Sequence, residues 1–153
     1  MLNEAIVAGV GLRHNNTMYE IFSHTADLGL RVRAAALPAL FADAACGLFS
    51  MVVDDLAAVR TMESRELQVA GSDLTYLLFD WLNELLYLCD TERFVFSQFD
   101  VRLDDSGLTA TGRGEPIDPA RHRLTHEIKA ITYHELKVEK EGELWLAEVI
   151  VDI

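Results

Sequence analysis

Two carboxylates stand side by side at the end of the sequence, where Asp152 precedes the free carboxylate of Ile153. The stretch AEVIVDI at 147–153 alternates as a strand does, so Asp152 points away from the face that carries Val151 and Ile153. Carboxylate oxygens are hard ligands, and this pair together with a third acid would suit Ca²⁺, Mg²⁺ or Mn²⁺. Glu148 lies about 13 Å along the strand from Asp152 and is a poor third ligand. The alternative is an ordinary surface ion pair between Asp152 and a lysine.

The last two strand patterns of the sequence predict a hairpin with its turn centred at residues 141–142. In that register Asp152 lies opposite Ile131, and Lys129 is a diagonal neighbour of Asp152 at about 7 to 8 Å. The same register turns His134 toward the core, where it would be a hydrogen-bonded structural residue. Lys129 therefore has two open interpretations, as the partner of a surface ion pair or as part of a charged site.

A second candidate position lies in SHTADLGL, residues 23–30, between two strand patterns. Asp27 could ligate a metal ion, or it could only cap the turn through an Asx hydrogen bond. His24 could be a metal ligand or a proton-transfer group, or it could only satisfy the turn. Gly112 and Gly114 have the spacing of part of a phosphate loop, but no helix pattern follows them, which favours strand or bulge glycines.

The elements that must position these residues predict an α+β fold. We expect a single two-layer domain in which a mainly antiparallel or mixed β-sheet packs against two main α-helices. Ser72 is the predicted N-cap of the second helix, with Asp73 in its first turn. Acidic residues interrupt that helix too often for it to cross a bilayer, and no membrane association is expected. The predicted strands are residues 19–24, 28–34, 65–69, 94–103, 107–116, 127–139 and 144–153, and the predicted helices are residues 37–52 and 73–90.

Length and charge restrict the class of protein. The chain has 153 residues, which predicts one folded domain at 18–153, preceded by an N-terminal arm at 1–17. Lys and Arg total 13 against 25 Asp and Glu, and this net charge of −12 argues against strong direct nucleic-acid binding. Cys46 and Cys89 both fall inside helical patterns, which indicates reduced core thiols in a cytoplasmic protein.

Four stretches, in order along the chain, resemble the archease family. They are YEIFSHTADLGLRV at 19–32, LLFDWLNELLYL at 77–88, GEPIDPARH at 114–122, and EIKAITYHELKV followed by the final WLAEVIVDI. The resemblance covers residues 18–153 and leaves the arm at 1–17 without a counterpart. Archeases are protein partners of the RNA-splicing ligase, which joins 2′,3′-cyclic-phosphate or 3′-phosphate RNA ends to 5′-hydroxyl ends.

The resemblance implies an accessory role rather than an enzyme. Archeases promote the metal- and GTP-dependent guanylylation of the ligase histidine, and they restore multiple turnover in tRNA splicing or RNA repair. The family's essential acids match Asp27 and Asp152, and its essential lysine matches Lys129. The implied metal site consists of Asp27, Asp152 and the carboxylate of Ile153, and the implied cofactor is a divalent ion, Ca²⁺, Mg²⁺ or Mn²⁺. The alternatives are a free-standing metal-dependent phosphoesterase and a chaperone-like scaffold.

Overall fold

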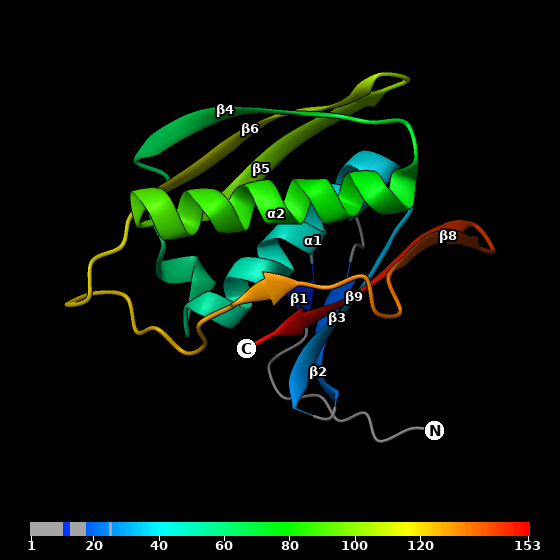
Figure 1. Cartoon of the computed structure of the whole chain (residues 1–153). Coiled ribbons are helices and arrows are strands. Elements are labelled where there is room, and N and C mark those ends of the chain that lie inside the picture. Colours follow the sequence, from blue (N-terminus) through cyan, green and yellow to red (C-terminus); the bar gives the residue numbers. More distant parts are fainter. Residues whose placement is uncertain (1–10, 13–17, 25) are drawn as a thin grey trace.

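The described residues form two antiparallel sheets with two helices between them (Figure 1). This computed structural model describes residues 11–12, 18–24 and 26–153, and the statements below concern that part of the chain. The larger sheet has the order β1-β2-β3-β9-β7, with β8 also paired to β9, and the smaller sheet has the order β4-β6-β5. The strands are β1 (Gly11–Leu12), β2 (Met18–His24), β3 (Asp27–Ala34), β4 (Glu63–Ala70), β5 (Phe94–Asp104), β6 (Gly107–Pro116), β7 (Ala130–Ile131), β8 (Lys137–Glu141) and β9 (Leu144–Asp152), and the helices are α1 (Leu37–Val52), the 3-10 turn η1 (Leu56–Ala58) and α2 (Leu74–Glu92).

Helix α1 is the centre of the core because it packs against both sheets. It begins just before Pro38, whose fixed φ suits the first turn of a helix. The buried residues Phe41 and Phe49 of α1 are among the largest in the core, together with Trp81 of α2. The Trp81 indole N–H donates to the Phe41 carbonyl at 3.0 Å and ties the two helices together. Neither helix of the described chain has the length and apolar character needed to cross a membrane.

The predicted α+β class with two main helices is confirmed. The strands divide between two sheets, however, and every strand pairing within the described part of the chain is antiparallel. Alternation within a strand does not specify its partners, so the sequence could not separate one sheet from two. The predicted N-cap of α2 was wrong by one residue. Asp73 is the cap, since its side chain accepts from the Tyr76 N–H at 3.1 Å, and Ser72 lies outside the helix.

The prediction that Gly112 and Gly114 are strand glycines is confirmed, since both lie in β6. A Cβ on Gly114 would lie 1.9 Å from the Val95 carbonyl oxygen of β5, so only glycine permits this approach of the two strands. The register of β5 shifts between Phe96 and Gln98, close to this contact.

Part of the predicted N-terminal arm joins the larger sheet. Gly11 pairs with Tyr19 and Leu12 with Met18, so β1 extends the sheet beyond β2. The rest of the arm, residues 1–10 and 13–17, lies outside the described residues.

Candidate functional site

Asp27 and Asp152 lie at the same edge of the larger sheet. The antiparallel pairing of β3 with β9 places Leu28 opposite Val151, and the next residues outward are Asp27, which begins β3, and Asp152, which ends β9. Leu28 and Val151 are buried in the core, so the two acids point to the other face of the sheet, which we call the outer face. Both acids are half-buried, as is Ile153. Two residues 125 positions apart in sequence therefore present carboxylates at one edge.

Lys129 lies beside Asp152 through the main chain. The Lys129 N–H donates to the Asp152 carbonyl oxygen at 2.8 Å. The observed register pairs Ala130 with Asp152, so the predicted pairing with Ile131 was wrong by one residue. The Lys129 side chain is exposed, and among the ion pairs of the described residues none joins it to Asp152. The simple surface ion pair between these two side chains is not formed.

The register differs because residues 132–136 leave the sheet between β7 and β8. The observed turn is Gly142–Glu143, one residue beyond the predicted position, and Val138 lies opposite Ala147. Along β9, only two residues separate the partners of β7 and β8, whereas five residues separate those strands themselves. Such an insertion leaves the apolar pattern of the strands before and after it unchanged. Its position therefore cannot be predicted from the alternation of apolar and polar residues.

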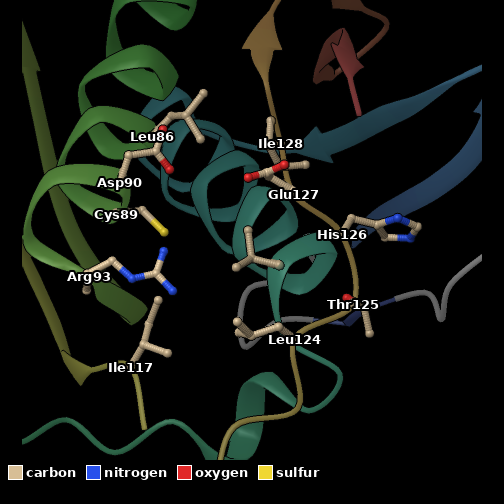
Figure 2. Close-up of a pocket in the computed structure, with 11 residues that line it drawn as sticks. Leu86, Cys89, Asp90, Arg93, Ile117, Leu124, Thr125, His126, Glu127 and Ile128 are labelled. Carbon is tan, nitrogen blue, oxygen red and sulfur yellow. The ribbon is translucent and has the colours of Figure 1, made fainter. Parts of the chain in front are cut away.

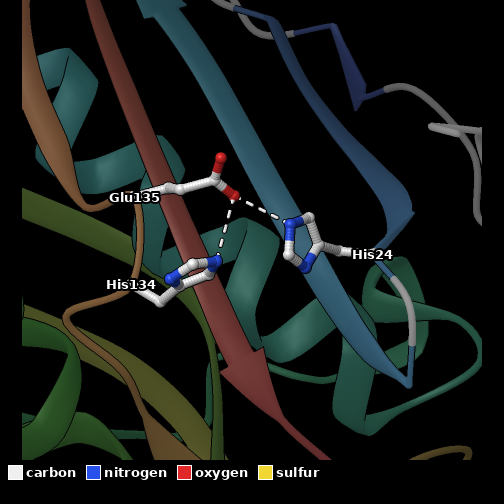
Figure 3. Close-up of side chains that lie close together, drawn as sticks. All are labelled: His24, His134 and Glu135. Carbon is white, nitrogen blue, oxygen red and sulfur yellow. Dashed lines mark ion pairs between the residues drawn. The ribbon is translucent and has the colours of Figure 1, made fainter. Parts of the chain in front are cut away.

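This insertion reverses the predicted environment of His134. We predicted a core residue, but the His134 side chain is 64% exposed. The loop carries His134 and Glu135 over the outer face toward His24 at the end of β2, on the side of β3 and β9 that faces away from α1 (Figure 3). His24 Nε2 lies 2.8 Å from a Glu135 carboxylate oxygen, so His24 makes an ion-pair contact outside its own turn. The sequence did not indicate a functional role for Glu135, because its position in space depends on the insertion.

Glu148 is engaged in a separate set of ion pairs on the outer face. One Glu148 oxygen accepts from Arg31 Nε at 2.5 Å, and the other lies 3.5 Å from Lys137 Nζ. Arg33 also pairs with Glu141 at 2.8 Å, which joins β3 to β8. Because its carboxylate is held by these cations, Glu148 is not available at the Asp27–Asp152 edge.

Comparison with known proteins supports a specific family. The model of the Archease protein family matches residues 19–153. The chain belongs to the archease family. "Protein archease" of Methanopyrus kandleri is 41% identical over 139 residues, covering 88% of this chain and 99% of that protein. "Protein archease" of Sulfurisphaera tokodaii is 39% identical over 137 residues, covering 88% and 98%.

Two solved structures share the fold of this archease-family chain. The solution structure of protein 1598 of Methanobacterium thermoautotrophicum is 37% identical with a TM-score of 0.78, over 88% of this chain and 98% of that one. The crystal structure of an archease from Thermotoga maritima, described as a "possible chaperone", has a TM-score of 0.62 over 85% and 93% of the two chains. At 22% identity the second comparison supports the fold alone.

The family-like stretch GEPIDPARH forms a buried network rather than part of the acidic edge. Glu115, only 7% exposed, accepts from the Arg60 N–H at 2.7 Å, from the Arg121 guanidinium and from the His122 ring at 2.9 Å. The other His122 nitrogen, Nδ1, accepts from the Asp118 N–H at 2.9 Å, so Nε2 carries the proton given to Glu115. Burial opposes the charged form of Glu115, but these hydrogen bonds outweigh it and lower the pKa to about 2. The network fixes the loop that follows β6.

A pocket of about 220 Å³ lies between the C-terminal ends of α1 and α2 and the segment 124–128 (Figure 2). Figure 2 shows the Arg93 side chain pointing across it from the end of α2. Asp27, Lys129, Asp152 and Ile153 are absent from its lining, so the two acids at the sheet edge lie outside this pocket. The lining residues are Val52, Leu86, Cys89, Asp90, Arg93, Ile117, Leu124, Thr125, His126, Glu127 and Ile128.

Proposed function

We propose that this archease-family chain is an accessory protein of the RNA-splicing ligase that joins 3′-phosphate to 5′-hydroxyl RNA ends. In this role it promotes metal-dependent guanylylation of the ligase histidine and multiple turnover in tRNA splicing or RNA repair. The observation that carries the proposal is the meeting of Asp27 and Asp152 at one edge of the sheet, through the β3–β9 pairing, in a chain of this family. The protein itself is not the ligase in this scheme and is not an enzyme.

The acidic edge would hold a divalent cation through Asp27, Asp152 and the terminal carboxylate of Ile153. The donor set fits such an ion, because the oxygens are hard ligands and the two side chains share one face and one edge. Ca²⁺, Mg²⁺ and Mn²⁺ all accept these ligands. A bound cation would supply positive charge to phosphate groups during nucleotide transfer to the ligase.

Lys129 would act as a contact residue beside this edge. Its side chain is exposed, while its main chain is hydrogen-bonded to Asp152, so its ammonium group is available to a phosphate or an acidic ligase residue. The net charge of −12 favours docking on a protein over direct RNA binding. The buried cysteine thiols of Cys46 and Cys89 suit a reducing cytoplasmic location, which is part of the proposal.

The test is a guanylylation assay with the matched ligase, GTP and Mn²⁺ or Mg²⁺, with and without this protein. Asp27→Ala, Asp152→Ala and Lys129→Ala should each reduce stimulation while remaining folded. Asp105→Asn and Arg102→Ala are the matched controls, since both alter exposed charges on the distant β5–β6 hairpin. Absence of stimulation by the unaltered chain would overturn the function, and full stimulation by all three variants would overturn the site.

A second experiment examines the terminal carboxylate. Extending the chain by a few residues after Ile153 removes that charge from its position without changing any side chain. We expect weaker Ca²⁺ or Mn²⁺ binding by calorimetry, and an unchanged affinity would remove Ile153 from the ligand set.

The same proteins and assays distinguish two other functions. A free-standing phosphoesterase would turn over a phosphate ester without ligase. A chaperone-like scaffold would bind its partner equally well after metal removal, whereas metal-dependent activation predicts loss of stimulation by a chelator.

A further inference from the structure

Three potential metal ligands meet over the outer face, and the proposed function uses none of them. They are His24 at the end of β2 and His134 and Glu135 in the loop 132–136 (Figure 3). One Glu135 oxygen lies 2.8 Å from His24 Nε2 and 3.5 Å from His134 Nε2, and one ligand atom from each residue lies within 4.8 Å of the others. We propose that these residues form a second metal site, selective for a divalent transition-metal ion such as Zn²⁺.

The donor set determines the class of ion. Two imidazoles with one carboxylate are a ligand set used by catalytic zinc sites, which leave a fourth position for water or another group. Ca²⁺ and Mg²⁺ instead take oxygen ligands and would select the acidic edge. His24 lies directly opposite Asp27 in the β2–β3 hairpin, so the two sites border each other while differing in chemistry.

The two ligand separations that involve Glu135 are close to those of a tetrahedral site. Metal–ligand bonds of about 2.0 to 2.1 Å separate the ligand atoms by about 3.3 Å, close to the observed 2.8 and 3.5 Å contacts. The two imidazole planes are inclined at 62° with centroids 5.4 Å apart, so they do not stack face to face and both can direct a nitrogen to a common centre. His134 and Glu135 are 64% and 57% exposed, which leaves room for their side chains to rotate.

The loop that carries two of the ligands is fixed at its base. Thr132 donates its N–H and its hydroxyl to the Ile150 carbonyl at 3.1 and 2.8 Å. The Tyr133 ring stacks on Phe79 of α2 with a centroid distance of 3.9 Å. Glu135 has φ +55°, in the left-handed region that a residue with a side chain adopts at an energetic cost. These contacts hold the ligand-bearing residues in position before an ion arrives.

The competing explanation is a latch, by which we mean that the His24–Glu135 ion pair alone holds the loop 132–136 against β2. A latch would not need His134, which lies farther from the Glu135 oxygen and is largely exposed. A metal site needs all three residues. His134→Ala therefore separates the two explanations, because it removes a ligand while leaving the 2.8 Å pair intact.

The experiment uses the full chain without a histidine tag, stripped of metal by a chelator. Zn²⁺ binding is measured by calorimetry and Co²⁺ binding by visible absorption, with parallel Ca²⁺ titrations. The variants are His134→Ala and Glu135→Gln, and His126→Ala is the matched control because it removes an exposed histidine outside the cluster. We expect one Zn²⁺ per chain, with affinity lowered at least about tenfold by either ligand variant and unchanged by the control. Thermal unfolding without metal confirms that each variant is folded.

Several results would overturn the site. They are the absence of saturable Zn²⁺ or Co²⁺ binding, equal affinities for His134→Ala and His126→Ala, and a thiolate band in the Co²⁺ spectrum, which would indicate Cys46 or Cys89 as ligand. Loss of Zn²⁺ binding in Asp152→Ala would assign the ion to the acidic edge instead. The experiment measures metal binding by the isolated chain, so it tests the second site independently of ligase stimulation.

Discussion

Glu115 should make the stability of this protein depend on pH in the acid range. Its carboxylate is buried and hydrogen-bonded to Arg60, Arg121 and His122, which lowers its pKa from 4.5 to about 2. A carboxyl group whose pKa is lower in the folded than in the unfolded protein stabilises the fold when ionised. This stabilisation is fully present above pH 4.5 and disappears as the pH falls toward 2.

The difference between the two pKa values corresponds to at most about 3 kcal/mol at neutral pH. Glu115→Gln keeps the shape of the side chain but removes the charge and leaves a poorer acceptor for Arg121 and His122. We therefore expect the free energy of unfolding to fall by about 2 to 3 kcal/mol at pH 7. The deficit should shrink as the pH falls below 4.5, where the unaltered protein also loses this contribution.

The assay is urea unfolding followed by tryptophan fluorescence at pH 7, 5, 4 and 3. Glu143→Gln is the matched control, because Glu143 is an exposed carboxylate in the turn between β8 and β9. Other carboxyl groups titrate in the same range, so the quantity to compare is the difference between variant and unaltered protein at each pH. A deficit that is equal at pH 7 and pH 3, or no larger than that of Glu143→Gln, would refute the reasoning.

Two further predictions concern the core. Gly29→Ala should lower the free energy of unfolding by about 1 to 3 kcal/mol in a thermal or urea unfolding experiment, because the added Cβ would lie 2.2 Å from the Phe22 ring. A change close to zero would mean that Phe22 moves aside without cost. Cys89 should resist thiol reagents in the native protein, since burial raises its pKa to about 11. Thiol titration should detect it only after denaturant is added, and rapid labelling of the native chain would contradict this.

Local patterns in the sequence were sufficient for the elements themselves. Strands β2 to β6 and both helices are confirmed close to their predicted bounds. Each of these depends on periodicity and turn residues within about 20 positions, which a single sequence displays directly. The side on which Asp152 lies was also predictable, because alternation within β9 needs no partner strand.

The convergence of distant residues could not be read in the same way. Pairing of β3 with β9 places Asp27 beside Asp152, but the sequence of neither strand indicates that the other is its partner. We expected these two residues to act together only because of the family resemblance. Their metal binding stays a prediction. The insertion at 132–136 was missed because five residues can leave a sheet without disturbing the apolar pattern on either side.

The sequence by itself determined both helices, most of the strands, the charge and the face on which Asp152 lies, since these follow from short-range stereochemistry and the spacing of apolar residues. Only the tertiary structure decided which strand edges meet, and with them the acidic edge, the Glu115 network and the His24–His134–Glu135 cluster. The physical reason is that strand pairing depends on the packing of both sheets against α1, a property of the whole core that no local pattern contains.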